Sequence, residues 1–289
     1  MKRLIIAFVI LLLAGDLYAM QPPRRGVEPE SLTLSAEVQA DSGFIGDCQL
    51  MDWGIRWAKM YGYYTTIAYS GDANVVKKDS ANAVSKVYDK GPSKNHLLQA
   101  TGAAQALWVA NAQNGRAGLT FDGTNTFYNF AFAPLAAGAP AMALVAALKT
   151  NVNTAASHVL FYQGTVTNVQ YKAYMPALYN NTMYFSNTNN DRETAAGTVA
   201  NNTNYILEWC YDGAAAFSAS QPSFYRNGAS LSSTQGTGTG TPDITQNVAY
   251  IGSGSEFPNR YKGSMFAGVL LYPRSAALTA FLNAVFAIY

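Results

Sequence analysis

The sequence has little charge and few histidines or cysteines. Only 12% of its 289 residues are charged, with 19 lysines and arginines against 17 acidic residues. A chain so close to neutral lacks the basic surplus with which proteins bind nucleic acid, which argues against this class of partner. The two histidines, His96 and His158, and the two cysteines, Cys48 and Cys210, stand far apart in the sequence, whereas a zinc centre takes three or four ligands at short spacings. No serine stands in a Gly-x-Ser-x-Gly pattern at a strand-to-helix turn, so that type of nucleophile is not expected.

Long apolar runs are also absent, except at the N-terminus. There Lys2 and Arg3 precede the run LIIAFVILLLAG, which is too short to span a bilayer comfortably, and Ala19 supplies a small residue for cleavage. These features predict a signal peptide over residues 1–19. An uncleaved anchor is the alternative, because Leu17 is not the small residue preferred before a cleavage site. We therefore expect a protein that is secreted or lies on an extracellular surface or in a periplasm, with no membrane insertion after cleavage.

The first part of the mature chain lacks the pattern of a folded domain. Residues 20–58 open with MQPPRRGVEPES, which is rich in proline and charge and has no sustained hydrophobic periodicity. We expect a linker or an arm there. The stretch MDWGIRWAKMYGYY fits either a short helix or a first strand, and the folded domain is placed at residues 59–289.

Short segments rich in β-branched and aromatic residues follow from about residue 84 onward. VSKVYD, TFYNF, HVLFYQ, TMYFS, YILEWCY, SFYR and VAYIG are separated by polar turns such as FDGTN, SNTNND and RNG. Many short strands without intervening helical periods predict an all-β fold, an antiparallel two-sheet jelly-roll sandwich.

Two segments have helical composition. AMALVAALK is rich in alanine, but its neighbours favour a strand buried on both sides. At the C-terminus, Thr279 can cap AFLNAVFAIY, where Phe281 with Val285 and Leu282 with Phe286 recur at helical spacing. We predict a short C-terminal helix that closes one end of the core.

The segment from Tyr205 to Gly228 carries a family resemblance. Apolar side chains alternate along YILEWCY, Asp212-Gly213 ends this strand, and SFYR with Asn227-Gly228 forms a hairpin turn. This order of strand, Asp-Gly, strand and Asn-Gly resembles the central hairpin of laminin-G-like domains of the concanavalin A-like lectin and glucanase superfamily, in their bacterial and phage form. Residues 84–124 resemble the opening of the same domain, and residues 251–289 resemble its end.

The resemblance implies that calcium can bind on loops at one edge of the sandwich. Oxygen ligands for it are available at Asp122, Asp191, Asp212 and Asp243. Asp122 and Asp212 are better explained as turn formers, because an aspartate side chain bonds backbone amides two residues further on. The metal content therefore stays open, and no other cofactor is expected.

Tyrosines are the main candidates for ligand contact, because a tyrosine ring stacks on a sugar while its hydroxyl forms a hydrogen bond. A place at the rim of the sandwich is the alternative explanation for each of them. Glycoside hydrolases of the superfamily carry carboxylates at alternate positions of one strand, as in Glu-x-Asp-x-x-Glu, and no such triplet occurs here. The nearest sequence lies in the polar run SNTNNDRET, which we predict to be a loop without catalytic residues. The candidate ligand-binding residues are Tyr162, Tyr171, Tyr184, Asp191, Arg192 and Glu193.

The two cysteines are Cys48 in the arm and Cys210 in the strand YILEWCY. If Leu207 and Trp209 face the core, Cys210 faces outward, where the arm can lie over the sheet. We predict a Cys48–Cys210 disulfide that clamps the arm, since a secreted chain reaches an oxidising compartment.

These observations favour a secreted, non-enzymatic recognition domain that binds glycan or another surface polymer. The alternative is a structural extracellular or virion surface protein, which assembles into a homo-oligomer or larger array through its N-terminal arm. A glycoside hydrolase is a third hypothesis, and two carboxyls facing each other across a groove would favour it.

Overall fold

The computed structural model describes residues 65–70, 76–89, 95–113, 116–151, 157–165, 173–187, 191–213, 217, 222–236, 240–245, 248–253 and 260–271. They all belong to the structural unit Cys48–Tyr289. The predicted signal peptide, the arm over residues 20–58 and the C-terminal helix lie outside the described residues. Within the described ranges, no helix has the length and hydropathy needed to cross a membrane.

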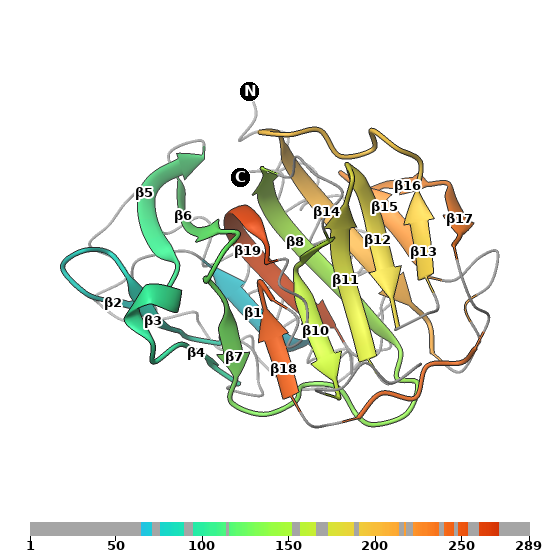
Figure 1. The fold of residues 1–289 in the computed structure, drawn as a ribbon, viewed down its shortest axis with the longest axis horizontal. Coiled ribbons are helices and arrows are strands. Elements are labelled where there is room, and N and C mark those ends of the chain that lie inside the picture. Colours follow the sequence, from blue (N-terminus) through green and yellow to red (C-terminus); the bar gives the residue numbers. More distant parts are fainter. Residues whose placement is uncertain are drawn as a thin grey trace, which may run out of the picture. The chain divides into compact units, whose positions relative to one another are not determined.

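One sheet has eight antiparallel strands (Figure 1). Their order is β16-β15-β14-β8-β19-β6-β5, and β1 pairs with β19 beside this path. The strands are β1 (Thr65–Ser70), β5 (Leu107–Gln113), β6 (Arg116–Asp122), β8 (Met142–Thr150), β14 (Asn204–Tyr211), β15 (Ser223–Arg226), β16 (Ala229–Leu231) and β19 (Lys262–Leu271).

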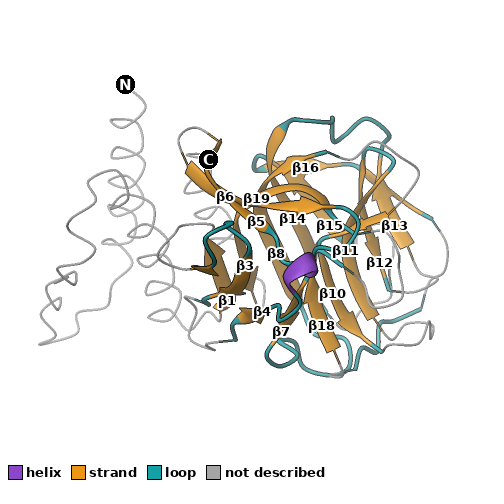
Figure 2. Cartoon of the chain, turned by 60° about the vertical axis from the view of Figure 1, so that its left-hand side comes forward, coloured by secondary structure: helices purple, strands orange, loops and turns teal. Residues whose placement is uncertain are grey.

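The other sheet has eleven strands, in the order β17-β13-β12-β11-β10-β18-β7-β4-β3-β2, with β9 pairing beside β11. Among the described residues, the 3₁₀ turn Gly102–Ala104 is the helix drawn in purple in Figure 2. The strands are β2 (Val76–Lys78), β3 (Val84–Val87), β4 (Leu97–Leu98), β7 (Tyr128–Phe130), β9 (Ser157–Val159), β10 (Phe161–Gly164), β11 (Ala173–Tyr179), β12 (Thr182–Ser186), β13 (Asp191–Thr194), β17 (Ser233–Gln235) and β18 (Val248–Ile251).

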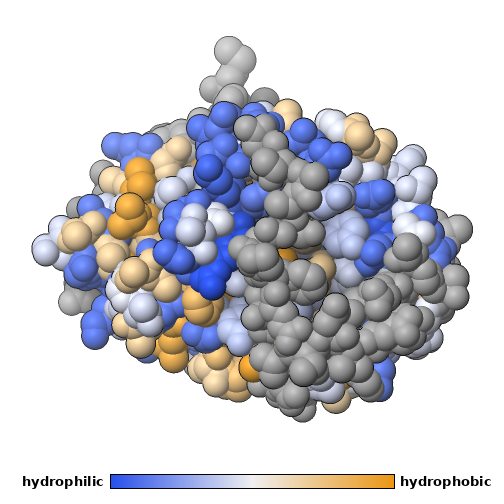
Figure 3. Space-filling model, in the orientation of Figure 1, coloured by the Kyte–Doolittle hydropathy of each residue, from blue (hydrophilic) through white to orange (hydrophobic). Residues whose placement is uncertain are grey.

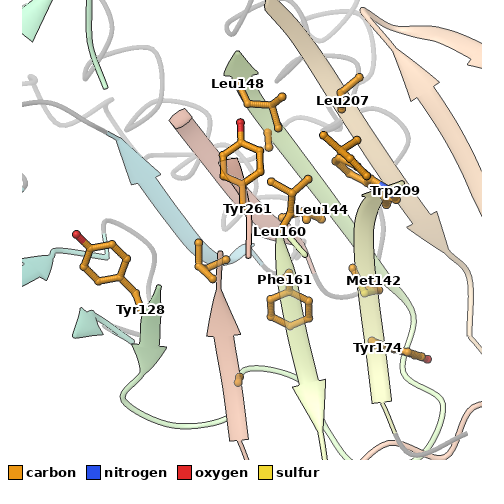
Figure 4. Close-up of a cluster of buried hydrophobic side chains, with 14 of the residues drawn as sticks. Tyr128, Met142, Leu144, Leu148, Leu160, Phe161, Tyr174, Leu207, Trp209 and Tyr261 are labelled. Atoms are coloured by element: carbon orange, nitrogen blue, oxygen red, sulfur yellow. The ribbon is translucent and has the colours of Figure 1, made fainter. Parts of the chain in front are cut away.

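The core lies between the two sheets, as expected for a β-sandwich. Leu144 of β8 stands opposite Trp209 of β14, and both belong to one large buried cluster that also includes Phe161 of the eleven-stranded sheet. Hydrophilic groups cover much of the surface, with smaller hydrophobic patches between them (Figure 3), whereas the cluster between the sheets is apolar and aromatic (Figure 4). Burial of this area is the main stabilising term of the fold.

The prediction of an all-β fold with two antiparallel sheets is confirmed: the described residues form such sheets with almost no helix. AMALVAALK is a strand, and residues Met142 to Leu148 are buried without interruption, as expected for a strand covered on both faces. Asn227 and Gly228 both have positive φ, at 51° and 81°, which is the geometry of the predicted Asn-Gly hairpin turn.

One sequence prediction about the fold was wrong. Asp191–Thr194 was expected in a loop, but it forms β13, which pairs with β12 on one side and β17 on the other. The residues DRET have low intrinsic strand preference, and pairing with two neighbours outweighs that preference. This difference places the two acidic side chains of the segment on a regular sheet.

Gly263 is required where β19 passes close to β8. Its φ is +149°, and a Cβ atom there would lie 2.3 Å from the carbonyl oxygen of Lys149. Only glycine allows the two strands to approach this closely without strain.

Candidate functional site

The eleven-stranded sheet has a second apolar cluster on the face that points away from the core. Along β11, Tyr174 and Leu178 belong to the core, whereas Ala173, Met175 and Ala177 belong to the second cluster. Alternate residues of a strand point to opposite faces, so this cluster lies on the face of the sheet opposite the core, where its five buried members are at most 5% exposed. We call this side of the sheet the outer face. Its second cluster is completed by Val159 and Tyr162, with Tyr184, Val248 and Tyr250 packed against it.

The strand register aligns several candidate residues across the outer face. Tyr250 of β18 stands opposite Tyr162 of β10 on one side and opposite Asn129 of β7 on the other. Further along the sheet, Ser186 of β12 stands opposite Asp191 of β13. Aromatic and acidic side chains from separate parts of the sequence therefore share one face.

Three aromatic rings form a row on this face, with the ring of Tyr250 in contact with those of Phe127 and Tyr162. We call these three residues the aromatic platform. The ring centroids of Tyr162 and Tyr250 are 6.2 Å apart, and those of Phe127 and Tyr250 are 5.9 Å apart. The Arg260 guanidinium lies 4.6 Å from the centre of the Phe127 ring, a cation–π contact. Arg260 also donates a hydrogen bond to the Asn125 carbonyl.

Within the platform, Tyr162 supports the other rings. It is only 4% exposed, and its hydroxyl donates to the carbonyl of Thr165. Phe127 and Tyr250 are half-buried, and partial burial raises the pKa of the Tyr250 hydroxyl. The ring of Tyr250 is therefore anchored on both sides while part of it stays accessible to a ligand.

Asp191 and Glu193 form a pair of carboxylates on the same face. They are two residues apart on β13, so their side chains point to the same side, with Cα atoms about 6.6 Å apart. Glu193 stands opposite Tyr184, and the Ser186 hydroxyl donates to Asp191 Oδ1 at 2.5 Å. Burial raises the pKa of the Tyr184 hydroxyl, and the charge of Asp191 and a hydrogen bond with it add to the rise. Tyr179 packs beside Tyr184 with ring centroids 5.9 Å apart.

Arg192 lies apart from the other candidate residues. Because it alternates with Asp191 and Glu193, it points to the opposite face, and it is 3% exposed. Its Nε donates to Ser233 Oγ at 2.7 Å and its Nη2 to the Ser233 carbonyl at 3.0 Å, which ties β13 to β17. Burial lowers the pKa of its guanidinium. Tyr171, the remaining candidate, lies outside the described residues.

Sequence reasoning missed the platform residues Phe127 and Tyr250, and Arg260 beside them. Tyr250 could have been found, because it alternates with the buried Ala249 and Ile251 in VAYIG. Phe127 and Arg260 are 133 positions apart in the sequence (260 − 127). No local sequence pattern predicts their contact.

Both histidines are engaged with the backbone. The ring of His158, in the middle of β9, donates from Nδ1 to the carbonyl of Arg260 at 2.9 Å, 102 positions further along the chain. Burial lowers the pKa of His158, and the nearby charge of Lys262 lowers it further. His96 accepts the amide of Asp89 at its Nδ1, at 3.0 Å. Among the described residues, no three histidine, cysteine, aspartate or glutamate side chains gather at a metal centre.

Asp122 forms a turn. Its Oδ1 accepts the amides of Thr124, Asn125 and Thr126 at 2.8, 2.9 and 3.0 Å. Burial raises the pKa of this carboxyl, but the hydrogen bonds outweigh burial and lower its pKa from 3.8 to about 2.

The side chain of Cys210 points to the face of β14 opposite that of Trp209, as strand alternation predicts, and the residue is 1% exposed. Its Sγ lies 2.8 Å from Glu208 Oε1. Cys48 lies outside the described residues, and the Cys48–Cys210 bridge stays a prediction.

The fold is similar to that of domains from solved glycoside hydrolases. An arabinofuranosidase complexed with arabinofuranosyl-α-1,2-xylobiose aligns with a TM-score of 0.57 and 16% identity, over 84% of this chain and 65% of that chain. A GH54 α-L-arabinofuranosidase aligns with a TM-score of 0.54 and 16% identity, over 84% of this chain and 66% of that chain. Domain 4 of AbnA, a GH43 extracellular arabinanase from Geobacillus stearothermophilus, in complex with arabinotriose, aligns with a TM-score of 0.50 and 11% identity, over 76% of this chain and 98% of that domain.

The chain therefore spans slightly less than two thirds of the arabinofuranosidases and nearly the whole of the arabinanase domain. No family model and no curated protein sequence matches it. At these identities the likeness concerns the fold alone. The protein is an antiparallel β-sandwich of a type also found in domains of glycoside hydrolases.

Proposed function

We propose that the protein is a secreted, non-enzymatic domain that binds glycan on the outer face of its eleven-stranded sheet. The observation that supports this most is the aromatic platform, in which Tyr250 is held between Phe127 and Tyr162 by ring contacts. Flat, partly exposed aromatic rings bind the apolar faces of sugars, and neighbouring polar groups bind their hydroxyls. Solved domains of the same fold that bind arabinose-containing ligands make a glycan the natural class of partner.

Each part of the outer face has a role in this proposal. Tyr250 and Phe127 stack on sugar rings, and Asn129, which stands opposite Tyr250, supplies an amide for hydroxyl groups. Asp191 and Glu193 accept hydrogen bonds from sugar hydroxyls further along the sheet. We also propose the finer assignment to a laminin-G-like jelly roll, on the basis of the strand and turn order from Tyr205 to Gly228.

Tyr250→Ala tests the platform. Contact of one ring face with a sugar removes roughly 60 Å² of apolar surface from water, about 1.5 kcal/mol, so the variant should bind about tenfold more weakly. Tyr250→Phe keeps the ring and is the matched control, with an expected loss below about threefold. The measurement is a glycan array with the mature protein, with and without a calcium chelator, followed by titration of the best ligand. Equal affinities of Tyr250→Ala and wild type would remove the platform from the site.

A glycoside hydrolase is a second candidate, because Asp191 and Glu193 share one face of a strand. Glycosidases use a pair of carboxyls, about 5–5.5 Å apart when the reaction retains configuration. Here Asp191 already accepts a hydrogen bond from the Ser186 hydroxyl at 2.5 Å. This contact favours hydrogen bonding to a ligand over hydrolysis.

Hydrolysis of aryl arabinofuranosides and of arabinan separates the two candidates. The binding proposal predicts no release of product by the wild-type protein. Product release that is lost in both Asp191→Asn and Glu193→Gln, with glycan binding retained, would establish the hydrolase instead.

A further inference from the structure

Positive charge is concentrated in one stretch of the sequence, which includes the edge strand of the eleven-stranded sheet. Residues 76–98, which include β2, β3 and β4, hold five lysines and two aspartates, a net charge of +3 (5 − 2). The whole chain carries +2 (19 − 17), so the remaining residues together carry −1 (2 − 3). The nearly neutral average therefore hides a local basic region.

Two of these lysines face each other on neighbouring strands. Lys77 of β2 stands directly opposite Lys86 of β3, and like charges at such positions destabilise a sheet. Lys77 is exposed, and Lys86 Nζ lies 4.5 Å from the centre of the Tyr88 ring. We call Lys77 and Lys86 the basic strip.

The aspartates of this region are engaged with the backbone. Asp79 Oδ1 accepts the amides of Ala81 and Ala83, each at 2.9 Å. Asp89 is 3% exposed, and its Oδ2 accepts the amide of Asn95 at 2.8 Å. Both carboxylates thus accept hydrogen bonds from backbone amides, and a repulsive lysine pair on an exposed surface suits an anionic ligand.

The basic strip is continuous with the outer face. Lys86 stands opposite Leu98, Leu98 opposite Asn129, Asn129 opposite Tyr250, and Tyr250 opposite Tyr162. Four strand spacings of about 4.8 Å separate Lys86 from Tyr162, roughly 19 Å in all. One oligosaccharide can therefore contact the strip and the aromatic platform together.

We propose that the basic strip is an anionic subsite of the glycan site, which binds carboxylate or sulfate groups of an acidic polysaccharide. The proposal rests on the proposed function. An anion placed between the two ammonium groups replaces their repulsion by two attractive interactions. Tyr88 and Leu98, which are 37% and 41% exposed, provide apolar contact for the sugar ring that bears the anion.

Lys78 is the matched control for charge. It follows Lys77 on β2, and its Nζ donates to Asn82 Oδ1 at 2.6 Å and lies 4.6 Å from the centre of the Trp108 ring. Trp108 belongs to β5 of the other sheet, so Lys78 points away from the basic strip. Lys78→Gln removes one charge from the same strand without touching the strip.

The experiment compares ligands that differ in charge alone. Polygalacturonate and its methyl ester form one pair, and dextran sulfate and dextran form the other. Wild-type protein, Lys77→Gln/Lys86→Gln and Lys78→Gln are titrated with all four polymers at low salt. Exposed ion pairs contribute up to about fivefold in affinity per lysine. The double variant should therefore lose about three- to twentyfold for a charged polymer and less than twofold for its neutral counterpart.

Lys78→Gln should bind like wild type, and about 1 M salt should abolish the preference for charge, because it screens exposed charges. The first polymer pair reports carboxylate recognition and the second reports sulfate recognition. No preference of the wild-type protein for the charged member of either pair overturns the proposal, and so does an equal effect of Lys78→Gln and the double variant. Binding of neutral glycans that depends on Tyr250 would still support the proposed function in that case.

Discussion

Removal of the Tyr128 hydroxyl is expected to destabilise the fold by several kcal/mol. Tyr128 is fully buried in β7, and its Oη donates to the Val84 carbonyl at 2.9 Å and accepts the Ala106 amide at 3.1 Å. Burial raises the pKa of this hydroxyl, so it stays protonated and continues to donate. Tyr128→Phe leaves two buried backbone groups without this partner, at about 1–3 kcal/mol each. We predict a loss of about 2–4 kcal/mol, a large part of the 5–15 kcal/mol typical of a domain.

Urea unfolding followed by tryptophan fluorescence measures this loss. Tyr250→Phe is the matched control, because it removes the same hydroxyl from a half-buried position on the outer face, and its expected cost is below about 0.5 kcal/mol. Equal midpoints for the two variants would refute the reasoning, since they would mean that the buried hydrogen bonds of Tyr128 contribute nothing.

Three further predictions concern single residues. Gly263→Ala should cost on the order of 3 kcal/mol in urea unfolding, because its Cβ would meet the Lys149 carbonyl at 2.3 Å and φ is +149°; an unchanged midpoint would contradict the close approach of the strands. The lowered pKa of Asp122, about 2 against 3.8, gives stability that is present above about pH 4 and lost as the pH falls through 2. Since the side chain is largely exposed, Asp122→Asn should cost about 1 kcal/mol or less at pH 6 and only a small part of that at pH 2, where the folded-state carboxyl is about half protonated. The Cys48–Cys210 bridge predicts two additional thiols in the denatured protein after reduction, and equal counts before and after would rule the bridge out.

The fold class could be predicted from the sequence because its signals are local. Alternation in YILEWCY places Trp209 in the core and Cys210 on the other face, and the structure has this arrangement. Asn227-Gly228 likewise specifies a turn, because both residues adopt positive φ. Such features depend on neighbours within a few positions, and a single sequence contains them.

The candidate site could be predicted only in part. Tyr162, Tyr184, Asp191 and Glu193 do share the outer face. The orientation of Arg192 could not be predicted, because it depends on strand pairing. β13 forms between two neighbouring strands in spite of its polar residues, and in this strand the Arg192 side chain points inward. The pairing register of strands that are distant in the sequence cannot be predicted from any short stretch of residues.

The central claim is that a glycan lies on the outer face, over β7, β18 and β10. Hydrogen exchange of the mature protein, measured with and without the best ligand from the array, tests it most directly. The account predicts added protection in the peptides that contain Phe127, Tyr162 and Tyr250. Protection confined to the eight-stranded sheet, for example to the hairpin at Asn227-Gly228, with those peptides unchanged, would contradict it.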